Sequence, residues 1–386
     1  MRTVYFDHAA TTPVDKQVLE TMLPLYKSNF GNPSSAHSAG QDVNVAVEEV
    51  REKIASIINA EPSEIIFTSG GTESDNAAIK GVADATGNNE IITSRIEHHA
   101  VLHPIECGKR HGFQPVYVDV DEHGRVSPAD IEDAITNDTA LVSLMHVNNE
   151  IGAINPVKEI ADICNNHDIP FHSDTVQSAG KLHLDMEETH FDLVSISGHK
   201  IYGPKGIGVL YVRSGTPWIP WMQGGSQERR RRGGTLNAPG IIGLGKAFEL
   251  ADNRMDEHKK EYTSYRQTLE KELKKRFGDR VSFNSNLETG VPHILNITVS
   301  NKDDSPLDGE MLLLNLDMEG VQVSNGSACT SGAIEPSHVL TNLGLSDEMA
   351  KSSIRISMGQ ANSEDDIPYF LEKFETVIER MDSTNS

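Results

Sequence analysis

The sequence predicts an α/β protein with a large, mostly parallel sheet, and three observations carry this prediction. Short apolar runs rich in Ile and Val alternate with helical periodicity from about residue 15 to residue 255. Such alternation favours parallel strands with helices on both faces of the sheet. The chain has 386 residues, which is too long for one hydrophobic core of usual size. A different mixture of strands and helices follows residue 255, so we expect a second, smaller α+β domain.

Seven runs in the first part have the pattern of strands and predict a seven-stranded sheet. Helical stretches lie between many of them, at Glu73–Ala85, His99–His111 and Pro156–His167. Ligands of such sheets bind at the carboxyl ends of the strands. The seven runs are Ile65–Phe67, Glu90–Thr93, Pro115–Val118, Ala140–Leu144, Ile169–His172, Leu193–Ile196 and Gly208–Tyr211.

A long polar helical stretch, Gly240–Phe277, is the expected bridge out of the large domain. We therefore expect a large domain over residues 15–255 and a small domain built from residues 1–14 and 256–386. The elements predicted for the small domain are Val281–Phe283, His293–Val299, Gly309–Glu319, Val321–Val323, Ser353–Ser357 and Glu364–Met381.

The composition bears on partners and location. The net charge of −23 argues against nucleic acid as the main partner, because a polyanion would be repelled. No apolar run approaches the ~18–20 residues that span a bilayer, and the first residues lack the apolar region of a signal peptide. We therefore expect a soluble, cytoplasmic protein without a membrane partner.

The cysteines and histidines do not predict a metal or disulfide framework. Cys107, Cys164 and Cys329 have no Cys-x-x-Cys spacing, which leaves open a single reactive thiol. His99 and His103 have the i, i+4 spacing that can bind a metal, but no carboxylate or thiolate partner stands at ligand spacing. We expect no metal site.

A lysine and a carboxylate point to the cofactor pyridoxal phosphate (PLP). Lys200 lies in a glycine-flanked turn after Ser197 and His199, and Asp174 ends an apolar run about 25 positions earlier. A lysine can form an imine with the PLP aldehyde, and a carboxylate can pair with the protonated pyridine nitrogen. Single buried Lys and Asp residues are usually structural, so neither residue decides alone.

A second turn suits the phosphate of such a cofactor. Residues Ser69–Glu73 follow a predicted strand and open a predicted helix. Glycines there let the backbone approach a phosphate, and a helix N-terminus supplies free N–H groups. A plain tight turn is the alternative. Ser197 and His199 can donate to the same phosphate, and this coincidence favours a cofactor site.

Seven motifs along the chain point to one family. They are Tyr5–Pro13, Gly31–His37, Phe67–Asn76, Glu97–Val101, Met145–Gly152, Ser197–Gly208 and Gly326–Gly332. Together they make the chain resemble, nearly end to end, the NifS-like and IscS-like cysteine desulfurases of the PLP-dependent class V aminotransferase superfamily. The resemblance implies fold type I of the PLP-dependent transferases, as in aspartate aminotransferase.

The resemblance also implies roles for residues at matching positions. Lys200 is the lysine that binds the cofactor, and Asp174 is the partner of the pyridine nitrogen. Gln177 hydrogen-bonds the phenolic oxygen of the cofactor, and His98 stacks on its ring and assists proton transfer. The residues that hold the phosphate are Gly71, Thr72, Ser197 and His199.

Three further residues complete the implied site. Thr235 matches the residue that reaches the phosphate from the neighbouring subunit, so the resemblance implies a homodimer. Asn149 and Arg355 match the groups that orient cofactor and substrate, and Arg355 can bind the substrate carboxylate through two hydrogen bonds. The alternative for Arg355 is a salt bridge that holds its own strand.

Cys329 distinguishes the desulfurases from the aminotransferases. It lies in the small, polar stretch Asn325–Gly332, where we expect an accessible thiolate. The stretch Ser327–Arg355 resembles the branch with an extended catalytic loop. The resemblance implies that L-cysteine becomes L-alanine while Cys329 takes the sulfur as a persulfide. An iron–sulfur scaffold or another acceptor protein would receive that sulfur, for cluster assembly or thiolation.

Two features depart from the family pattern. The chain ends about 30 residues after Arg355, so we expect the shorter nitrogen-fixation-type members to match it better. The run Arg229–Arg232 is unusually basic. It is either a phosphate or partner patch, or a solvated or intersubunit salt-bridged segment.

Three alternative functions stay open. A selenocysteine lyase would reject cysteine, and a class V aminotransferase would have no use for Cys329. A sulfur-relay or scaffold protein would keep the fold only to bind a partner, and would not need the whole set of site residues.

Overall fold

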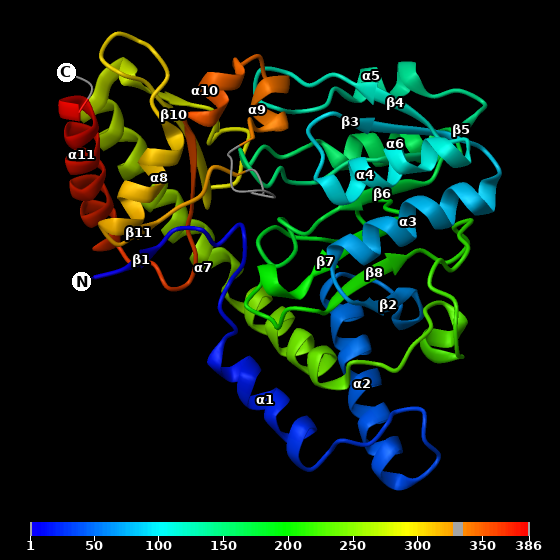
Figure 1. Ribbon diagram of the computed structural model, residues 1–386. Helices are drawn as coiled ribbons and strands as arrows, with labels where there is room; N and C mark the ends of the chain where they lie inside the picture. Colours follow the sequence, from blue (N-terminus) through cyan, green and yellow to red (C-terminus); the bar gives the residue numbers. More distant parts are fainter. Residues whose placement is uncertain (1, 327–334, 385–386) are drawn as a thin grey trace.

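The computed structural model describes residues 2–326 and 335–384. Figure 1 shows two units side by side, one built around a large sheet and the other containing both ends of the chain. The arrangement confirms the predicted fold class, an α/β protein with a mostly parallel sheet and a smaller α+β part.

The large sheet has seven strands in the order β2-β8-β7-β6-β5-β3-β4. Strand β8 runs antiparallel to both of its neighbours, and the other pairs are parallel. The bounds are β2 (Ile65–Thr68), β3 (Glu90–Ser94), β4 (Gln114–Val118), β5 (Thr139–Ser143), β6 (Phe171–Asp174), β7 (Leu193–Ser197) and β8 (Gly208–Val212). Strand β6 begins two residues later than predicted, because Pro170 has no N–H to donate to the sheet.

Neighbouring residues of each strand point to opposite faces, and each face has its own helices. Ile92 and Val142 belong to a core with α1, α2, α5, α6 and the first part of α7, whereas Ile91 and Leu141 pack with α3 and α4. Both faces are therefore covered, as parallel strands require. The helices are α1 (Lys16–Lys27), α2 (Ser38–Ile57), α3 (Gly71–Thr86), α4 (His99–Gly108), α5 (Pro128–Ala134), α6 (Val157–Asn166) and α7 (Ala238–Phe277).

The smaller unit combines an antiparallel sheet with helices. Its sheet has the order β12-β10-β9, and β1 pairs in parallel with β11. The strands are β1 (Val4–Tyr5), β9 (Val281–Phe283), β10 (Ile294–Val299), β11 (Val321–Gln322) and β12 (Ser353–Ser357). The helices are α8 (Gly309–Met318), α9 (His338–Asn342), α10 (Asp347–Lys351) and α11 (Asp366–Thr384).

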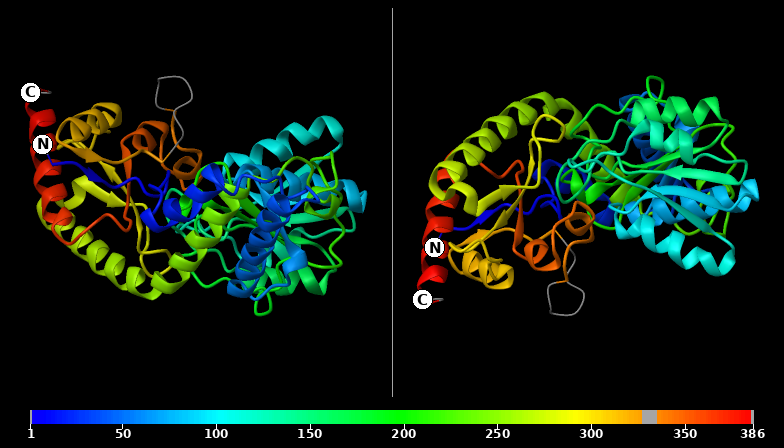
Figure 2. Two further views of the ribbon diagram at one scale, coloured as in Figure 1. Left: turned by 90° about the horizontal axis from the view of Figure 1, so that it is seen from below. Right: turned by 90° about the horizontal axis from the view of Figure 1, so that it is seen from above.

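Helix α7 connects the two units, as Figure 2 shows. Its residues Leu244 and Phe248 belong to the core of the large sheet, whereas Leu269 and Leu273 belong to the core of the smaller unit. The second core also contains Val4 from the start of the chain. We therefore propose the domain division expected from the sequence, at residues 14/15 and 255/256.

Residues 2–326 and 335–384 contain neither a membrane-spanning helix nor a cluster of metal ligands. No helix there has the length and apolar character to cross a membrane. No group of three or more His, Cys, Asp or Glu side chains in the same residues is arranged to hold a metal ion.

Candidate active site

A cavity of about 420 Å³ lies where several strands of the large sheet end, and we call it the active-site cavity. Asp174 and Ser197 are the last residues of β6 and β7, and Met145 follows β5. Ten residues singled out in the sequence line this cavity. They are Gly71, Thr72, His98, Asn149, Asp174, Gln177, Ser197, His199, Lys200 and Arg355.

One end of the cavity, the phosphate end, is formed by the start of α3. Gly70 caps this helix with a φ of 147°, a conformation that favours glycine. A Cβ on Gly71 would lie 2.8 Å from Val176 Cγ2, so the turn has no room for a side chain. Thr72, Ser197 and His199 border the same space. Free N–H groups, hydroxyls and a helix N-terminus together fit a phosphate.

An ion pair holds this turn from outside. Glu73 Oε2 accepts a hydrogen bond from the Ser69 N–H at 2.8 Å, and Arg232 Nε donates to Glu73 Oε1 at 2.8 Å. Burial alone would raise the pKa of Glu73, but the hydrogen bonds from Arg232 and Ser69 outweigh burial and lower it. Glu73 is therefore a charged anchor for the phosphate end.

The basic run is salt-bridged within the chain. Arg232 pairs with Glu73, and Arg229 lies 3.3 Å from Glu48. Two of its four arginines thus pair with carboxylates of the same chain, whereas the interpretation from the sequence was a solvated or intersubunit salt-bridged segment, which stays a prediction.

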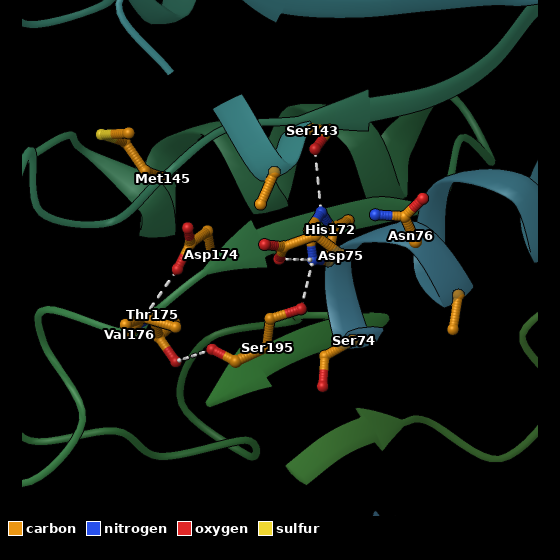
Figure 3. A network of polar contacts seen from close by, with 12 residues as sticks. Ser74, Asp75, Asn76, Ser143, Met145, His172, Asp174, Thr175, Val176 and Ser195 are labelled. Atoms are coloured by element: carbon orange, nitrogen blue, oxygen red, sulfur yellow. Dashed lines mark hydrogen bonds and ion pairs between the residues drawn. The ribbon is translucent and has the colours of Figure 1, made fainter. Parts of the chain in front are cut away.

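The other end of the cavity, the ring end, contains Asp174. One Asp174 oxygen accepts the Val176 N–H at 2.9 Å, as drawn in Figure 3. Burial raises the pKa of Asp174 to about 6. Its carboxylate is therefore largely ionised at pH 7 and can face a protonated ring nitrogen.

Three buried ionisable side chains lie near Asp174, and burial shifts the pKa of each toward its uncharged form. Burial raises the pKa of Glu97 to about 8, and burial together with Asp174 raises the pKa of Asp75 well above its usual value. Burial lowers the pKa of His172 to about 3. The ring end thus concentrates one negative charge on Asp174.

Hydrogen bonds fix His172 in this network (Figure 3). Its Nδ1 is 2.8 Å from Ser143 Oγ and its Nε2 is 2.9 Å from Ser195 Oγ. Asp75 Oδ1 is 3.6 Å from His172 Nε2, which is too long for a hydrogen bond. This buried oxygen has no hydrogen-bond partner among the described residues and borders the active-site cavity.

Lys200 occupies the middle of the cavity wall, in a 3₁₀ turn directly after β7. Its Nζ donates to the backbone oxygens of Ala9 at 2.5 Å and Ala10 at 2.7 Å. Burial, followed by the charge of Arg355, lowers the pKa of Lys200 to about 8. A substantial fraction of this amine is therefore uncharged near neutral pH, as a nucleophile or base requires.

Gln177 and His98 both border the same space. Gln177 Nε2 donates to the Ala9 oxygen at 2.8 Å. His98 caps α4 by accepting the Ala100 N–H at its Nδ1, at 3.1 Å, so Nε2 carries the ring proton. Burial, followed by Lys200, lowers the pKa of His98 to about 4. A neutral imidazole therefore lies beside the position expected for a cofactor ring.

Arg355 forms an ion pair with Asp7 and also lines the active-site cavity. Its Nη2 donates to Asp7 Oδ1 at 2.8 Å and to Ser324 Oγ at 3.0 Å, and its Nη1 donates to the Asn149 backbone oxygen at 2.8 Å. Its Nε is buried without a hydrogen-bond partner in the described parts of the chain. Arg355 is thus fixed by an ion pair and still borders the cavity, where it can meet a carboxylate.

One predicted site residue lies outside the cavity lining, and another lies outside the described residues. Thr235 is exposed and lies outside the cavity lining. Cys329 lies outside the described residues, although Ser324 and Gly326 shortly before it line the cavity.

Sequence reasoning missed four residues that shape the site. Asp7, Asp75 and Glu97 stood inside quoted motifs, but their roles depend on contacts across the fold. Lys181 lay outside every motif. Its Nζ donates to Gln177 Oε1 at 3.1 Å, and only its spacing of four residues from Gln177 could have indicated this.

The residues present fit PLP. A glycine turn without room for side chains would take the phosphate, the buried Asp174 carboxylate would pair with the ring nitrogen, and the buried Lys200 amine lines the same cavity. Arg355 also lines this cavity, where a guanidinium would suit the carboxylate of an amino-acid substrate.

Comparisons with known proteins show the family of this chain. The family model for aminotransferase class-V matches residues 4–370. The chain is 48% identical to cysteine desulfurase IscS of Dictyoglomus turgidum, over 98% of this chain and 95% of the relative. It is 44% identical to cysteine desulfurase IscS of Methanosarcina thermophila, over 98% and 93%.

Solved structures give the same result. A NifS-like protein superposes with a TM-score of 0.91 at 38% identity. The match covers 98% of this chain and 100% of the other. A structure of SspA in complex with cysteine has a TM-score of 0.81 at 39% identity, covering 92% and 99%.

Proposed function

Because this chain belongs to the class-V aminotransferase family, we propose that it is a PLP-dependent cysteine desulfurase. It converts L-cysteine to L-alanine and transfers the sulfur to Cys329 as a persulfide. The observation that carries the proposal is the single cavity lined by Lys200, Asp174, the phosphate end and Arg355. Gly326, three positions before Cys329 in the sequence, borders the same cavity.

When bound, PLP supplies an electron-withdrawing ring that stabilises negative charge on the substrate α-carbon. Thr72, Ser197 and His199 would hold its phosphate, Asp174 would keep its ring nitrogen protonated, and Lys200 would bind its aldehyde carbon.

The chain's own residues handle the substrate and its protons. Arg355, held by Asp7, binds the substrate carboxylate. Lys200 takes the α-proton, for which its lowered pKa of about 8 is suited. Neutral His98 can accept or donate a proton next to the ring. The Cys329 thiolate attacks the substrate sulfur, a sulfur–sulfur bond forms, and the electron pair of the broken carbon–sulfur bond remains on the carbon that becomes the alanine methyl group.

We also propose a homodimer. Thr235 is exposed and outside its own cavity, as expected for a residue that reaches a partner's phosphate. Large apolar side chains are exposed on and after α1, among them Leu19, Leu23, Tyr26 and Phe30. Phe30 is 78% exposed, which a single soluble subunit would rarely show next to three other exposed apolar side chains. A second copy covering this surface would bury them.

The sulfur then leaves Cys329 for an acceptor, an iron–sulfur scaffold or a thiolation protein, in the cytoplasm. The net charge of −23 supports protein acceptors over nucleic acid, because a polyanion is repelled.

Incubation of the PLP-loaded protein with L-cysteine and a reductant tests the proposal. We expect equal amounts of sulfide and alanine, and loss of both in Cys329→Ser with the absorbance of bound PLP unchanged. Neither product in the PLP-loaded protein would reject cysteine as the substrate. Turnover of selenocysteine alone would indicate a lyase, and full amino-group transfer in Cys329→Ser would indicate an aminotransferase.

A further inference from the structure

A second lysine lies next to the active-site cavity, outside the machinery described so far. Lys181 Nζ donates to Gln177 Oε1 at 3.1 Å. Gln177 Nε2 donates to the Ala9 oxygen at 2.8 Å, and Lys200 Nζ donates to the same oxygen at 2.5 Å. A continuous set of hydrogen bonds thus joins Lys181 to Lys200 through Gln177.

Lys181 determines which way the Gln177 amide points. An ammonium group has only donors, so it must face the amide oxygen. The Gln177 amide nitrogen then donates one N–H to the Ala9 oxygen, and its second N–H stays available. Because Gln177 lines the active-site cavity, its amide nitrogen can act in the cavity only as a hydrogen-bond donor to an acceptor oxygen.

Lys181 also contributes positive charge that nearby carboxylates do not neutralise. It lines a small second cavity of about 40 Å³, shared with Lys200. The other titratable side chains on that lining are His8, Tyr202, His258, Lys259, Tyr262 and His293, and it includes no carboxylate from the described residues.

The charges around Lys181 all oppose its own. Burial, followed by Lys200 and Arg355, lowers the pKa of Lys181 to about 7. The nearby imidazoles of His8 and His293 are neutral, because burial lowers the pKa of each. An anionic oxygen on the far side of Gln177 would relieve this repulsion.

We propose that Lys181 is a positioning residue that locks Gln177 as a hydrogen-bond donor and stabilises the anionic form of a phenolic oxygen held there. The proposal rests on PLP as the cofactor and assigns to Lys181 the charge of that oxygen. Lys181 itself touches neither cofactor nor substrate.

The experiment is a pH titration of the visible absorbance of the PLP-loaded protein. Loss of one positive charge several ångströms from an ionising group shifts its midpoint by about one pH unit. In Lys181→Met we expect the midpoint to rise by about one unit and PLP to bind about tenfold more weakly. Lys181→Arg, which keeps charge and donors, should restore both. Lys259→Met, an exposed lysine on the same small cavity, is the matched control and should change neither.

A double-mutant cycle tests the route through Gln177. If Lys181 acts through this amide, Lys181→Met adds little to the shift already produced by Gln177→Leu. An unshifted midpoint in a folded Lys181→Met protein, or fully additive shifts, would overturn the proposal. If Lys181→Met does not fold, Lys181→Gln replaces it with the same expected shift. If only the Lys181 proposal is wrong, the wild-type protein still releases alanine from L-cysteine. If the desulfurase proposal is wrong, the wild-type protein releases no alanine.

Discussion

The two ends of the active-site cavity are built from different chemical groups. The phosphate end consists of backbone N–H groups and hydroxyls at the start of α3, and its charged support, Glu73 with Arg232, stands outside the cavity. The ring end consists of buried ionisable groups, Asp174, Glu97 and His172. The phosphate end offers N–H and hydroxyl dipoles to an anion, whereas the ring end surrounds one carboxylate with buried polar groups.

This difference predicts that the phosphate end mainly determines the affinity for PLP and that the ring end mainly determines the turnover rate. Many small donors share the phosphate, so loss of one should weaken binding modestly. The ring end depends on one carboxylate whose neighbours are neutral, so a change there should affect turnover strongly.

Asp174→Ala removes the charge at the ring end and should give the largest effect. We expect turnover to fall by about 10³-fold or more, because the ring nitrogen loses the partner that keeps it protonated. PLP should still bind, since the phosphate end is intact. Alanine release and PLP content are the measurements. Turnover within tenfold of wild type would remove the distinction between the two ends.

Glu97→Gln should stabilise the fold increasingly as pH rises. The pKa of Glu97 is raised from 4.5 to about 8, so the folded state holds a proton that the unfolded state releases. Wild-type stability therefore decreases as pH rises from about 4.5 to 8, by about 1.4 kcal/mol for each pKa unit. Glutamine lacks this titration, and its amide oxygen can accept the Met145 N–H while its amide nitrogen donates to Ser94 Oγ.

Denaturant unfolding at pH 5 and pH 8 measures this difference between wild type and Glu97→Gln. A gap that stays constant with pH would mean that Glu97 is already ionised in the folded protein.

Arg232→Met should weaken PLP binding by about tenfold and leave turnover at saturating PLP nearly unchanged. The Glu73 carboxylate then loses the partner that holds it against the Ser69 N–H. PLP titration followed by absorbance gives the affinity. Arg229→Met, which breaks only an exposed ion pair with Glu48, is the control and should bind PLP normally. Equal loss in both variants would indicate a general effect of the basic run.

Thr235→Val should have the smallest effect, a loss of PLP affinity of about threefold, because it removes one neutral hydrogen bond. The loss should appear only in protein that sediments as a dimer. Thr268→Val, an exposed threonine on α7, should be silent. An unchanged affinity for Thr235→Val would exclude Thr235 from the partner's phosphate end.

The contrast between the two ends also explains which parts of the site could be predicted from the sequence. The phosphate end and Lys200 lie in short local motifs, and β12 was predicted at its observed bounds because Ile354 and Ile356 alternate with polar residues, as in a strand. The ring-end network joins α3, β3, β5, β6 and β7, and no local pattern indicates which buried carboxyl meets which imidazole. Helices α1 and α2 were not predicted individually, since Pro24 interrupts the first and polar residues dominate the second.

Asp7 and Arg355, which meet at 2.8 Å, are 348 residues apart in the chain. During synthesis, the large sheet leaves the ribosome long before β12 does. The growing chain therefore contains Lys200 and the turn before α3 while it still lacks Arg355, the guanidinium proposed to bind the substrate carboxylate. The residues proposed to bind the cofactor are thus synthesised well before the proposed substrate site is complete.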